Sequence, residues 1–336
     1  MDNNAKLHKP NSTFRISLTH GNGGEETSAL IESIFMKHFR NEYALMEDSA
    51  VLPFSGGRLA FTTDSFVVKP LFFPGGDIGR LAVCGTVNDL LTTGGKPLYL
   101  SASFIIEENA ESAVLDRIAS SMRESADEAG VFIVTGDTKV IEGSGGLYIN
   151  TSGVGEAGNF SFHSAEEGDV ILASGSLGDH HACILSQRMN IRNEIQSDAA
   201  PLVEMVNALV SSAVPVHGLR DITRGGLATV LNEAAAAAGL LAEIDETALP
   251  VSDSVSGFCK ILGLDPLYMG NEGKMLAVVP AQYGSEALEL IRKSRYGENA
   301  NIIGRFSRGT GVVMNTKIGG QRIIPRLSGE GLPRIC

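Results

Sequence analysis

The chain has 336 residues, with 27 Lys and Arg against 39 Asp and Glu, which gives a formal net charge of −12. That length is typical of two domains, and an acidic chain without a basic stripe argues against a nucleic-acid partner. No stretch reaches the roughly 18 apolar residues of a membrane span, and the polar first 20 residues do not resemble a signal peptide. Four scattered cysteines without a C-x-x-C pair indicate neither a disulfide framework nor a zinc site, so we expect a cytoplasmic protein.

The first half of the chain alternates short β-like runs with helical patterns. We expect a loose arm over residues 1–17, a glycine-rich loop (HGNGG, residues 20–24) and then a helix over residues 25–39. Gly130 directly follows a helical pattern, in the place of a C-cap glycine. The remaining predictions for this half are strands at 59–63, 66–68, 98–106, 131–135 and 147–154, and helices at 78–92 and 112–129.

Periodicity is lost over residues 156–168, so we predict a domain boundary there, with domains at 18–158 and 159–327. The last nine residues, 328–336, contain two Gly and a Pro, and we expect a mobile tail. Together the patterns predict an α/β (α+β) fold in two domains, without fixing the order of the strands. The second half is predicted to hold strands at 169–173, 275–279, 301–306 and 311–315, and helices near 179–190, 198–213 and 224–239.

Five aspartates lie beside β-like runs or glycine-rich turns, where side chains converge at the edge of an α/β sheet. Magnesium prefers oxygen ligands and is usually held by one or two carboxylates together with substrate phosphates and water. The alternative is that each Asp caps a helix or closes a turn, although hydroxyl residues such as Thr62, Thr138 and Thr223 recur in the same turns. The five are Asp48, Asp64, Asp89, Asp137 and Asp221.

Two glycine-rich loops precede helical patterns. Gly21, Gly23 and Gly24 could bind an anion through backbone N–H groups, and Gly225–Gly226 has the same position before a second helix. Tight turns are the alternative for both loops, and no Walker A sequence occurs. The G-x-G-x-x-G match at residues 153–158 is not followed by a helical pattern, so we do not predict a dinucleotide site there.

The final residue is a cysteine. Eight residue steps from Ser328 give Cys336 a reach of about 26 Å, so its thiol could move between an internal site and a partner. A terminal Cys without a function is the alternative. The apolar surroundings of the other three, Cys84, Cys183 and Cys259, predict core positions.

The motifs HGNGG, EDSAVL, TTDSFVV, VNDL, GDTKV, DITRGGL and GNEG, in that order, resemble the ATP-dependent superfamily of aminoimidazole ribonucleotide synthetase. The terminal PRIC resembles its hydrogenase-maturation branch, whereas the kinase branch lacks PRIC. The N-terminal loop also lacks the reactive Cys and Lys of selenophosphate synthetases. The resemblance implies a two-domain fold and a homodimer formed through the N-terminal sheets, with ATP and Mg²⁺ as cofactors.

Residue roles follow from the same resemblance. It matches Asp48, Asp64, Asp89 and Asp221 to the acids that bind magnesium and phosphate. It matches Asp137, Thr138 and Lys139 to the nucleotide-proximal strand end, and Gly21, Gly23 and Gly24 to the phosphate-covering loop. His20 could also touch phosphate, although a lone His is more often structural.

The implied activity uses the chain as its own substrate. A partner carbamoyltransferase, HypF, places a carbamoyl group on Cys336, ATP-dependent dehydration leaves a thiocyanate, and cyanide passes to a HypC–HypD complex. Glu272 is our candidate base and Lys139 a candidate phosphoryl ligand; a turn-stabilising Glu and a surface Lys are the alternatives. Two other functions remain open: a free-standing synthetase or small-molecule kinase, and a non-catalytic metal or ligand carrier that uses Cys336.

Overall fold

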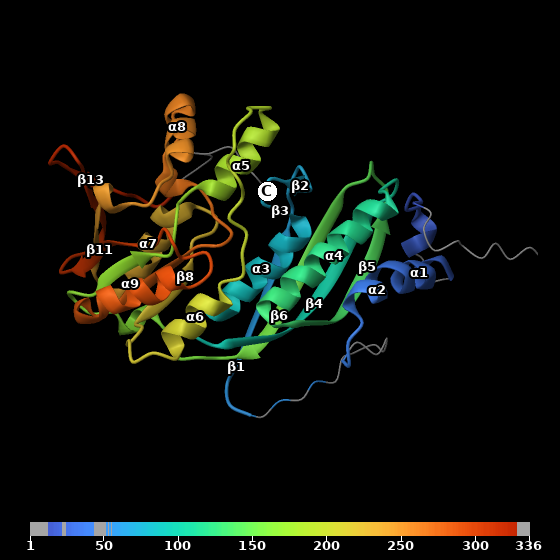
Figure 1. The fold of residues 1–336 in the computed structure, drawn as a ribbon, viewed down its shortest axis with the longest axis horizontal. Helices are drawn as coiled ribbons and strands as arrows, with labels where there is room; N and C mark the ends of the chain where they lie inside the picture. The colour runs from blue at the N-terminus through green and yellow to red at the C-terminus, as the bar shows by residue number, and fades with distance from the viewer. Residues whose placement is uncertain (1–12, 22–24, 44–51, 53, 55, 328–336) are drawn as a thin grey trace, which may run out of the picture.

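The computed structural model describes residues 13–21, 25–43, 52, 54 and 56–327. Its elements form two sheets that lie beside each other, with helices between and around them (Figure 1). None of the helices in the described ranges is long and apolar enough to cross a membrane.

The first sheet has four strands in the order β1-β6-β4-β5, in which only β4 and β5 run parallel. The long helices α3 and α4 pack together, and α3 contacts β1 and β6 on one face of the sheet. Residues alternate accordingly along β4, where Ala102, Phe104 and Ile106 are buried and Ile105 is exposed. The bounds are β1 Leu59–Phe66, α3 Ile78–Leu91, β4 Lys96–Glu107, α4 Ser112–Ala129, β5 Phe132–Ile141 and β6 Leu147–Glu156.

Shorter elements surround this sheet. A small hairpin precedes α3, and a run of helical turns packs near α4 and β5 at the start of the chain. Their bounds are η1 Leu18–Gly21, α1 Glu25–Leu30, η2 Ile31–Phe35, α2 Met36–Phe39, β2 Phe72–Phe73 and β3 Gly76–Asp77.

The second sheet has seven strands in the order β13-β12-β9-β11-β7-β10-β8, and only β12 and β9 run parallel. Its strands are β7 Val170–Ala173, β8 Gly218–Asp221, β9 Leu241–Asp245, β10 Met275–Val279, β11 Asn301–Ser307, β12 Gly311–Asn315 and β13 Gln321–Ile323. The helices are α5 Asp179–Arg188, α6 Val203–Val210, α7 Gly226–Ala238, α8 Asp253–Leu262 and α9 Gly284–Lys293. Short turns of 3₁₀ helix complete this part: η3 Phe162–Ser164, η4 Glu246–Ala248, η5 Pro266–Tyr268 and η6 Ala281–Tyr283.

Most of the predicted elements are confirmed. The helix at 112–129 has the expected bounds and ends at Gly130, whose φ of 68° is the left-handed conformation that favours glycine. The two runs around Asp64 form one continuous strand, because Asp64 pairs in register with Thr151 of β6. The helix expected over 25–39 is interrupted by the π-helical turn η2.

One helix is much shorter than predicted. The prediction began at residue 198, but α6 begins at Val203, and the preceding segment binds α3 instead. Arg80 of α3 donates to the carbonyl of Ala199 (2.6 Å). The side chain of Asn88 donates to the carbonyl of Ala200 (3.0 Å) and accepts from the backbone N–H of Leu202 (2.9 Å). These bonds hold residues 199–202 against the first half of the molecule.

Candidate functional site

Four of the predicted site acids come from separate elements. Asp64 lies in the middle of β1 and Asp89 in the last turn of α3, and Asp221 is the last residue of β8. Glu272 precedes β10, whose Met275 pairs in register with Asp221. The loop before β10 is tied to the end of β8, since the backbone N–H of Asn271 donates to the carbonyl of Ile222 (3.2 Å). The fold therefore brings three distant motifs to one place beside α3.

Burial and mutual repulsion disfavour negative charge on these acids. Burial, followed by the charge of Asp89, raises the pKa of Asp221 to about 7. Burial also raises the pKa of Asp89, although a hydrogen bond from the Thr62 hydroxyl (2.8 Å) opposes the shift. The pKa of Asp64 is raised by burial too. The directions of these shifts indicate that burial and the neighbouring acids outweigh the compensation from Arg220 and Arg224.

Glu272 is the most perturbed member. Its pKa is raised well above the ordinary value, first by burial and then by Asp198, Asp221 and Asp64, while Arg224 lowers it. Its backbone is fixed on both sides, because its N–H donates to Asp198 Oδ1 (3.1 Å) and its carbonyl accepts from Asn88 (3.4 Å). A buried carboxyl group with a raised pKa can accept a proton.

The donor set suits a hard divalent cation. Asp64, Asp89 and Asp221 offer only oxygen ligands and carry charge that repels itself, which a bound Mg²⁺ would relieve. Among the described residues, no three His, Cys, Asp or Glu side chains stand close enough together to enclose a metal ion by themselves. That openness agrees with magnesium chemistry, in which phosphates and water complete the coordination.

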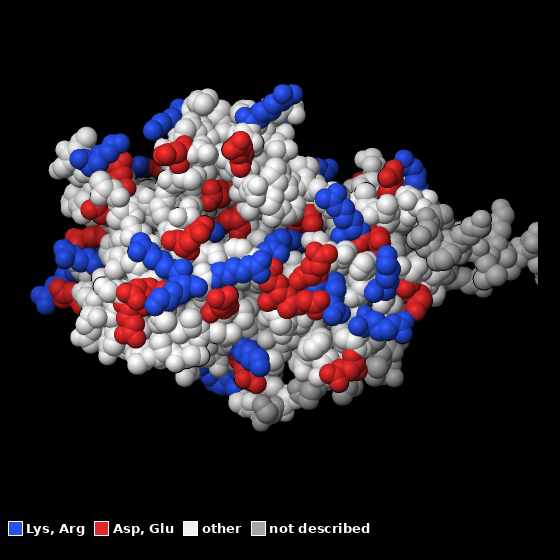
Figure 2. All heavy atoms as spheres, in the orientation of Figure 1, with Lys and Arg blue, Asp and Glu red and all other residues white. Residues whose placement is uncertain are grey.

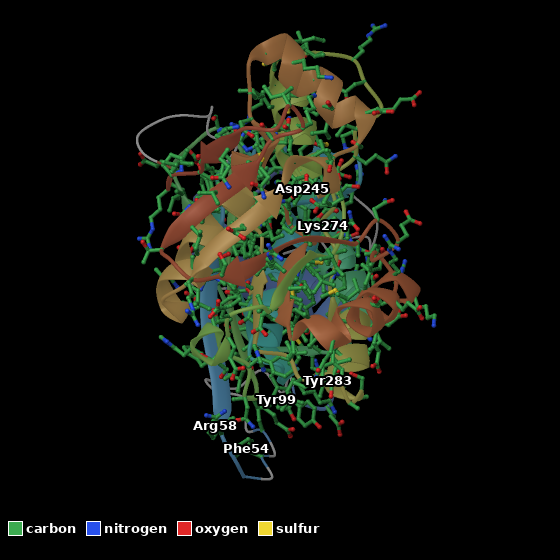
Figure 3. All side chains as sticks on the ribbon, turned by 90° about the vertical axis from the view of Figure 1, so that its left-hand side faces the viewer. Phe54, Arg58, Tyr99, Asp245, Lys274 and Tyr283 are labelled. Atoms are coloured by element: carbon green, nitrogen blue, oxygen red, sulfur yellow. The ribbon has the colours of Figure 1, made fainter. Side chains whose placement is uncertain are left out.

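A cavity of about 780 Å³, the arginine cavity, adjoins the acids and contains Asp89 and Asp221. Three arginines line it: Arg58, Arg220 and Arg224. Figure 3 shows Arg58 at the lower edge of the molecule, beside the start of β1. We had not predicted these arginines, although Arg220 and Arg224 flank Asp221 in the sequence RDITRGGL. Guanidinium groups match the geometry of phosphate oxygens.

The residues predicted to lie near the nucleotide line a different cavity. Gly21, Asp137, Thr138 and Lys139 border a space of about 350 Å³ whose other wall contains apolar side chains of η2 and β4. A side chain at Gly21 would lie 2.8 Å from the backbone nitrogen of Val140, so only glycine fits there. Lys139 and Asp137 form an exposed ion pair (2.9 Å), which lowers the pKa of Asp137.

The register of the first sheet separates Asp137 from the acid cluster. Asp137 of β5 pairs with Ser103 of β4. Ser103 pairs with Asn150 of β6, which in turn pairs with Ser65 of β1. Three strand spacings span about 14 Å. Because successive side chains alternate between faces, Asp64 also points to the opposite face from Ser65, toward α3.

The other predicted site features fall as follows. Asp48, Gly23, Gly24 and Cys336 lie outside the described residues. His20 bonds to the hydroxyl of Ser17 (2.9 Å) and stacks on the ring of Phe14. The G-x-G-x-x-G match begins inside β6 and is not followed by an α-helix. Cys84, Cys183 and Cys259 are buried, and burial raises the pKa of the Cys84 thiol to about 12.

Comparison with known proteins identifies the family. Residues 46–157 match the N-terminal domain of AIR synthase related proteins, and residues 166–317 match their C-terminal domain. Carbamoyl dehydratase HypE of Rhodobacter capsulatus is 47% identical over 96% of this chain and 98% of its own length. A crystal structure of hydrogenase maturation protein HypE in complex with ATP has a TM-score of 0.91, with 45% identity over 95% of this chain and 99% of that one. HypE in a HypE–HypF complex has a TM-score of 0.78, with 47% identity over 89% of this chain and 100% of that one. The chain therefore belongs to the carbamoyl dehydratase HypE family of the AIR synthase related proteins.

Proposed function

We propose that this protein uses ATP to dehydrate an S-carbamoyl group on its own Cys336 to a thiocyanate, which supplies the cyanide ligands of nickel–iron hydrogenase. The observation that carries the proposal is the acid cluster beside the arginine cavity, in which Asp221 is buried and Asp89 and Glu272 are half-buried, and in which the pKa of each carboxyl group is raised. The close relatives named carbamoyl dehydratase and the related ATP complex support it.

The reaction balances as a dehydration coupled to ATP cleavage. The carbamoyl oxygen attacks the γ-phosphorus and ADP leaves. Loss of the resulting phosphate, together with both protons of the nitrogen, turns S–C(=O)–NH₂ into S–C≡N. Such a reaction needs positioning and charge neutralisation more than covalent help from the protein.

The described residues divide this work between them. Asp64, Asp89 and Asp221 would hold magnesium, with Asp48 as a further candidate outside the described ranges. When bound, magnesium neutralises phosphate charge. We assign the phosphates to the arginine cavity, and we assign Gly21, Asp137, Thr138 and Lys139 to the nucleotide.

Glu272 is the proposed base for the nitrogen protons. Burial and the neighbouring carboxylates raise its pKa, which favours proton uptake during the reaction. Asp198 and Asn88 hold its backbone, so the side chain is attached to a fixed support.

The end of the described chain starts close enough for Cys336 to reach this base. The Tyr268 hydroxyl donates to the carbonyl of Pro325 (3.0 Å), and Asn232 donates to that of Ile324 (3.0 Å). Four residue steps separate Tyr268 from Glu272, at most about 14 Å. The eleven steps from Pro325 to Cys336 span up to about 36 Å.

We also propose a homodimer that pairs the open faces of the first sheet. That face carries exposed apolar side chains, of which Phe61 is the most exposed, at 71%. Apolar area of this kind on a sheet face marks an interaction surface. The others are Leu59, Ile105, Phe132 and Ile141.

HypF is the proposed carbamoyl donor, supported by the related HypE–HypF complex, and a HypC–HypD complex is the proposed cyanide acceptor.

Intact-mass spectrometry after incubation with ATP and a carbamoyl-donor system tests the function. The wild-type chain should gain a carbamoyl group and then lose one water. Cys336→Ala should show neither change but should still bind ATP, whereas the control Cys259→Ala should behave as wild type. A modified mass on Cys336→Ala would refute the proposal.

A further inference from the structure

A third cavity, the acidic channel, lies between the two halves of the molecule and has a volume of about 590 Å³. It is bordered by the start of α3, by α4, by the start of α5 and by residues that follow α9. Figure 2 shows acidic and basic side chains crowded along the middle of one face, between α9 and α4. Six acidic side chains line the channel, against three basic ones: Asp77, Glu124, Glu128, Asp179, Asp198 and Glu298 against Arg80, Lys274 and Arg295.

The inner end of the acidic channel adjoins the proposed base. Lys274 and Asp198 form an ion pair there (3.2 Å), with side chains only 8% and 5% exposed. Figure 3 shows Lys274 near the middle of the view, well above Arg58. The other oxygen of Asp198 accepts the backbone N–H of Glu272. Asp198 therefore connects the wall of the channel to the Glu272 loop.

Two acids near the start of the channel already have partners. Glu128 pairs with Arg80 (2.9 Å) and Arg295 (2.8 Å), and Asp77 caps α3 by accepting from the N–H of Gly79 (2.7 Å). Asp179 accepts a hydrogen bond from the side chain of Ser252 but, in the described part of the chain, forms no ion pair with Lys or Arg. Burial and the charge of Asp198 raise its pKa to about 6. A cation beside Asp179 would relieve both effects.

The last residues of the chain offer one such cation. Arg334 is the sole basic residue of SGEGLPRIC, two positions before Cys336. In an extended chain, two positions correspond to about 7 Å. If the sulfur of Cys336 lies at Glu272, the guanidinium group of Arg334 would therefore lie in the channel, on the Asp179 side of Asp198.

The length of the tail allows this arrangement. Pro325 is held on Tyr268, and Lys274 lies six residue steps beyond Tyr268, at most about 22 Å along the chain. The nine steps from Pro325 to Arg334 span up to about 30 Å.

We propose that the acidic channel guides the chain's own tail to Glu272, with the guanidinium of Arg334 paired to the carboxylate of Asp179. The pairing rests on the proposed function, since that function is what requires Cys336 to reach Glu272. Arg suits the position because its planar fork binds a carboxylate through two parallel hydrogen bonds. The pair sets the register of the tail and so delivers the sulfur, two residues on, to the base.

Disulfide trapping tests the route independently of catalysis. In an Arg334→Cys, Cys336→Ser background, Asp179→Cys should form a disulfide within one chain under mild oxidation, without ATP or a carbamoyl donor. Ser176→Cys, on the same wall, provides a second probe should Asp179→Cys fail to fold. The matched comparison is Thr223→Cys, on the wall of the arginine cavity, which should stay reduced. Non-reducing electrophoresis and peptide mass spectrometry read the result. No disulfide in the channel, a dominant link to position 223, or links only between two chains would overturn the proposal.

A charge exchange tests the pair itself. Arg334→Glu should slow thiocyanate formation on the carbamoylated tail about tenfold or more, with ATP affinity unchanged. Combining it with Asp179→Arg should restore most of the rate. Arg326→Glu makes the same charge change nearer the start of the tail and should leave the rate unchanged. An equal loss in Arg326→Glu, or no recovery in the exchanged pair, would show that Asp179 and Arg334 do not pair. Disulfide trapping in the channel, combined with no thiocyanate formation on the wild-type chain, would preserve the channel and refute only the proposed function.

Discussion

Asp137 and Asp221 both lie in strands beside Gly and Thr residues, in the motifs GDTKV and DITRGGL, yet their surroundings are opposite. Asp137 is exposed and paired with Lys139 on the open face of the first sheet, and its pKa is lowered. Asp221 is 8% exposed and lies near two other carboxylates, and its pKa is raised to about 7. Similar sequence contexts thus give one carboxylate that is already neutralised and one that is not.

The difference indicates which acids can gain most from a ligand. An exposed ion pair contributes little to stability because water already solvates both charges. A buried carboxylate without a counter-ion is costly, so a cation that binds there recovers the lost solvation. We therefore expect substitutions in the buried cluster to have large effects on chemistry, and substitutions in the exposed pair to have small ones.

The largest effect should come from Glu272→Gln, which keeps the shape of the side chain but removes the proton acceptor. We expect thiocyanate formation to fall about 10²–10⁴-fold, the usual contribution of a general base, with ATP affinity unchanged. Single-turnover rates on the carbamoylated chain, together with calorimetric ATP titrations, measure both quantities. A wild-type rate would remove Glu272 from the mechanism.

Asp221→Asn should have the next largest effect, with opposite signs in two assays. Affinity for the magnesium–nucleotide complex should fall about 10–100-fold, as expected for the loss of a ligand or its support, and calorimetry would show it.

Without metal, the Asp221→Asn variant should be more stable than wild type. A pKa raised from 3.8 to about 7 makes ionisation unfavourable in the folded state. The wild type should therefore lose stability relative to Asp221→Asn as the pH rises from about 4 to about 7, by a few kcal/mol at most. Urea unfolding in EDTA at several pH values tests this, and a less stable variant at pH 8 would contradict it.

Lys139→Ala tests the exposed pair and should have the smallest effect. The free energy of unfolding should change by less than about 1 kcal/mol, as for other surface ion pairs. ATP affinity should fall only a few-fold, as expected for one exposed point charge beside the nucleotide. Lys37→Ala, which breaks another exposed pair with Asp116, is the matched control and should leave ATP affinity unchanged. A loss as large as that of Asp221→Asn would place Lys139 in the reaction centre.

Much of the fold could be predicted because its signals are local. The fold class is confirmed, and the bounds of α4, β10 and β12 agree with hydrophobic periodicity and a single C-cap glycine. Helices α8 and α9 and strands β8 and β9 were missed. The sequence of the segment before α6 predicts a helix. Pro201, together with the hydrogen bonds from Arg80 and Asn88 to this segment, keeps it extended instead. A distant contact of that kind leaves no periodic pattern.

The site was predictable as a set of residue types but not as an arrangement. The motifs selected Asp64, Asp89, Asp221 and Glu272, whose roles remain predictions. Which sheet face each acid occupies depends on strand register, and this separates Asp137 from the cluster. The arginines of the cavity were missed because an isolated charged residue is usually solvated. Their spacing around Asp221 was the available signal.

The contact between α3 and residues 199–202 also constrains how such sequences can diverge. Ala199, Ala200 and Leu202 contribute main-chain atoms to its hydrogen bonds, and their side chains are buried. Asn88, which is 2% exposed, supplies both a donor and an acceptor and also reaches the carbonyl of Glu272. One codon change at position 88 would thus loosen the contact between the halves and the support of the base together.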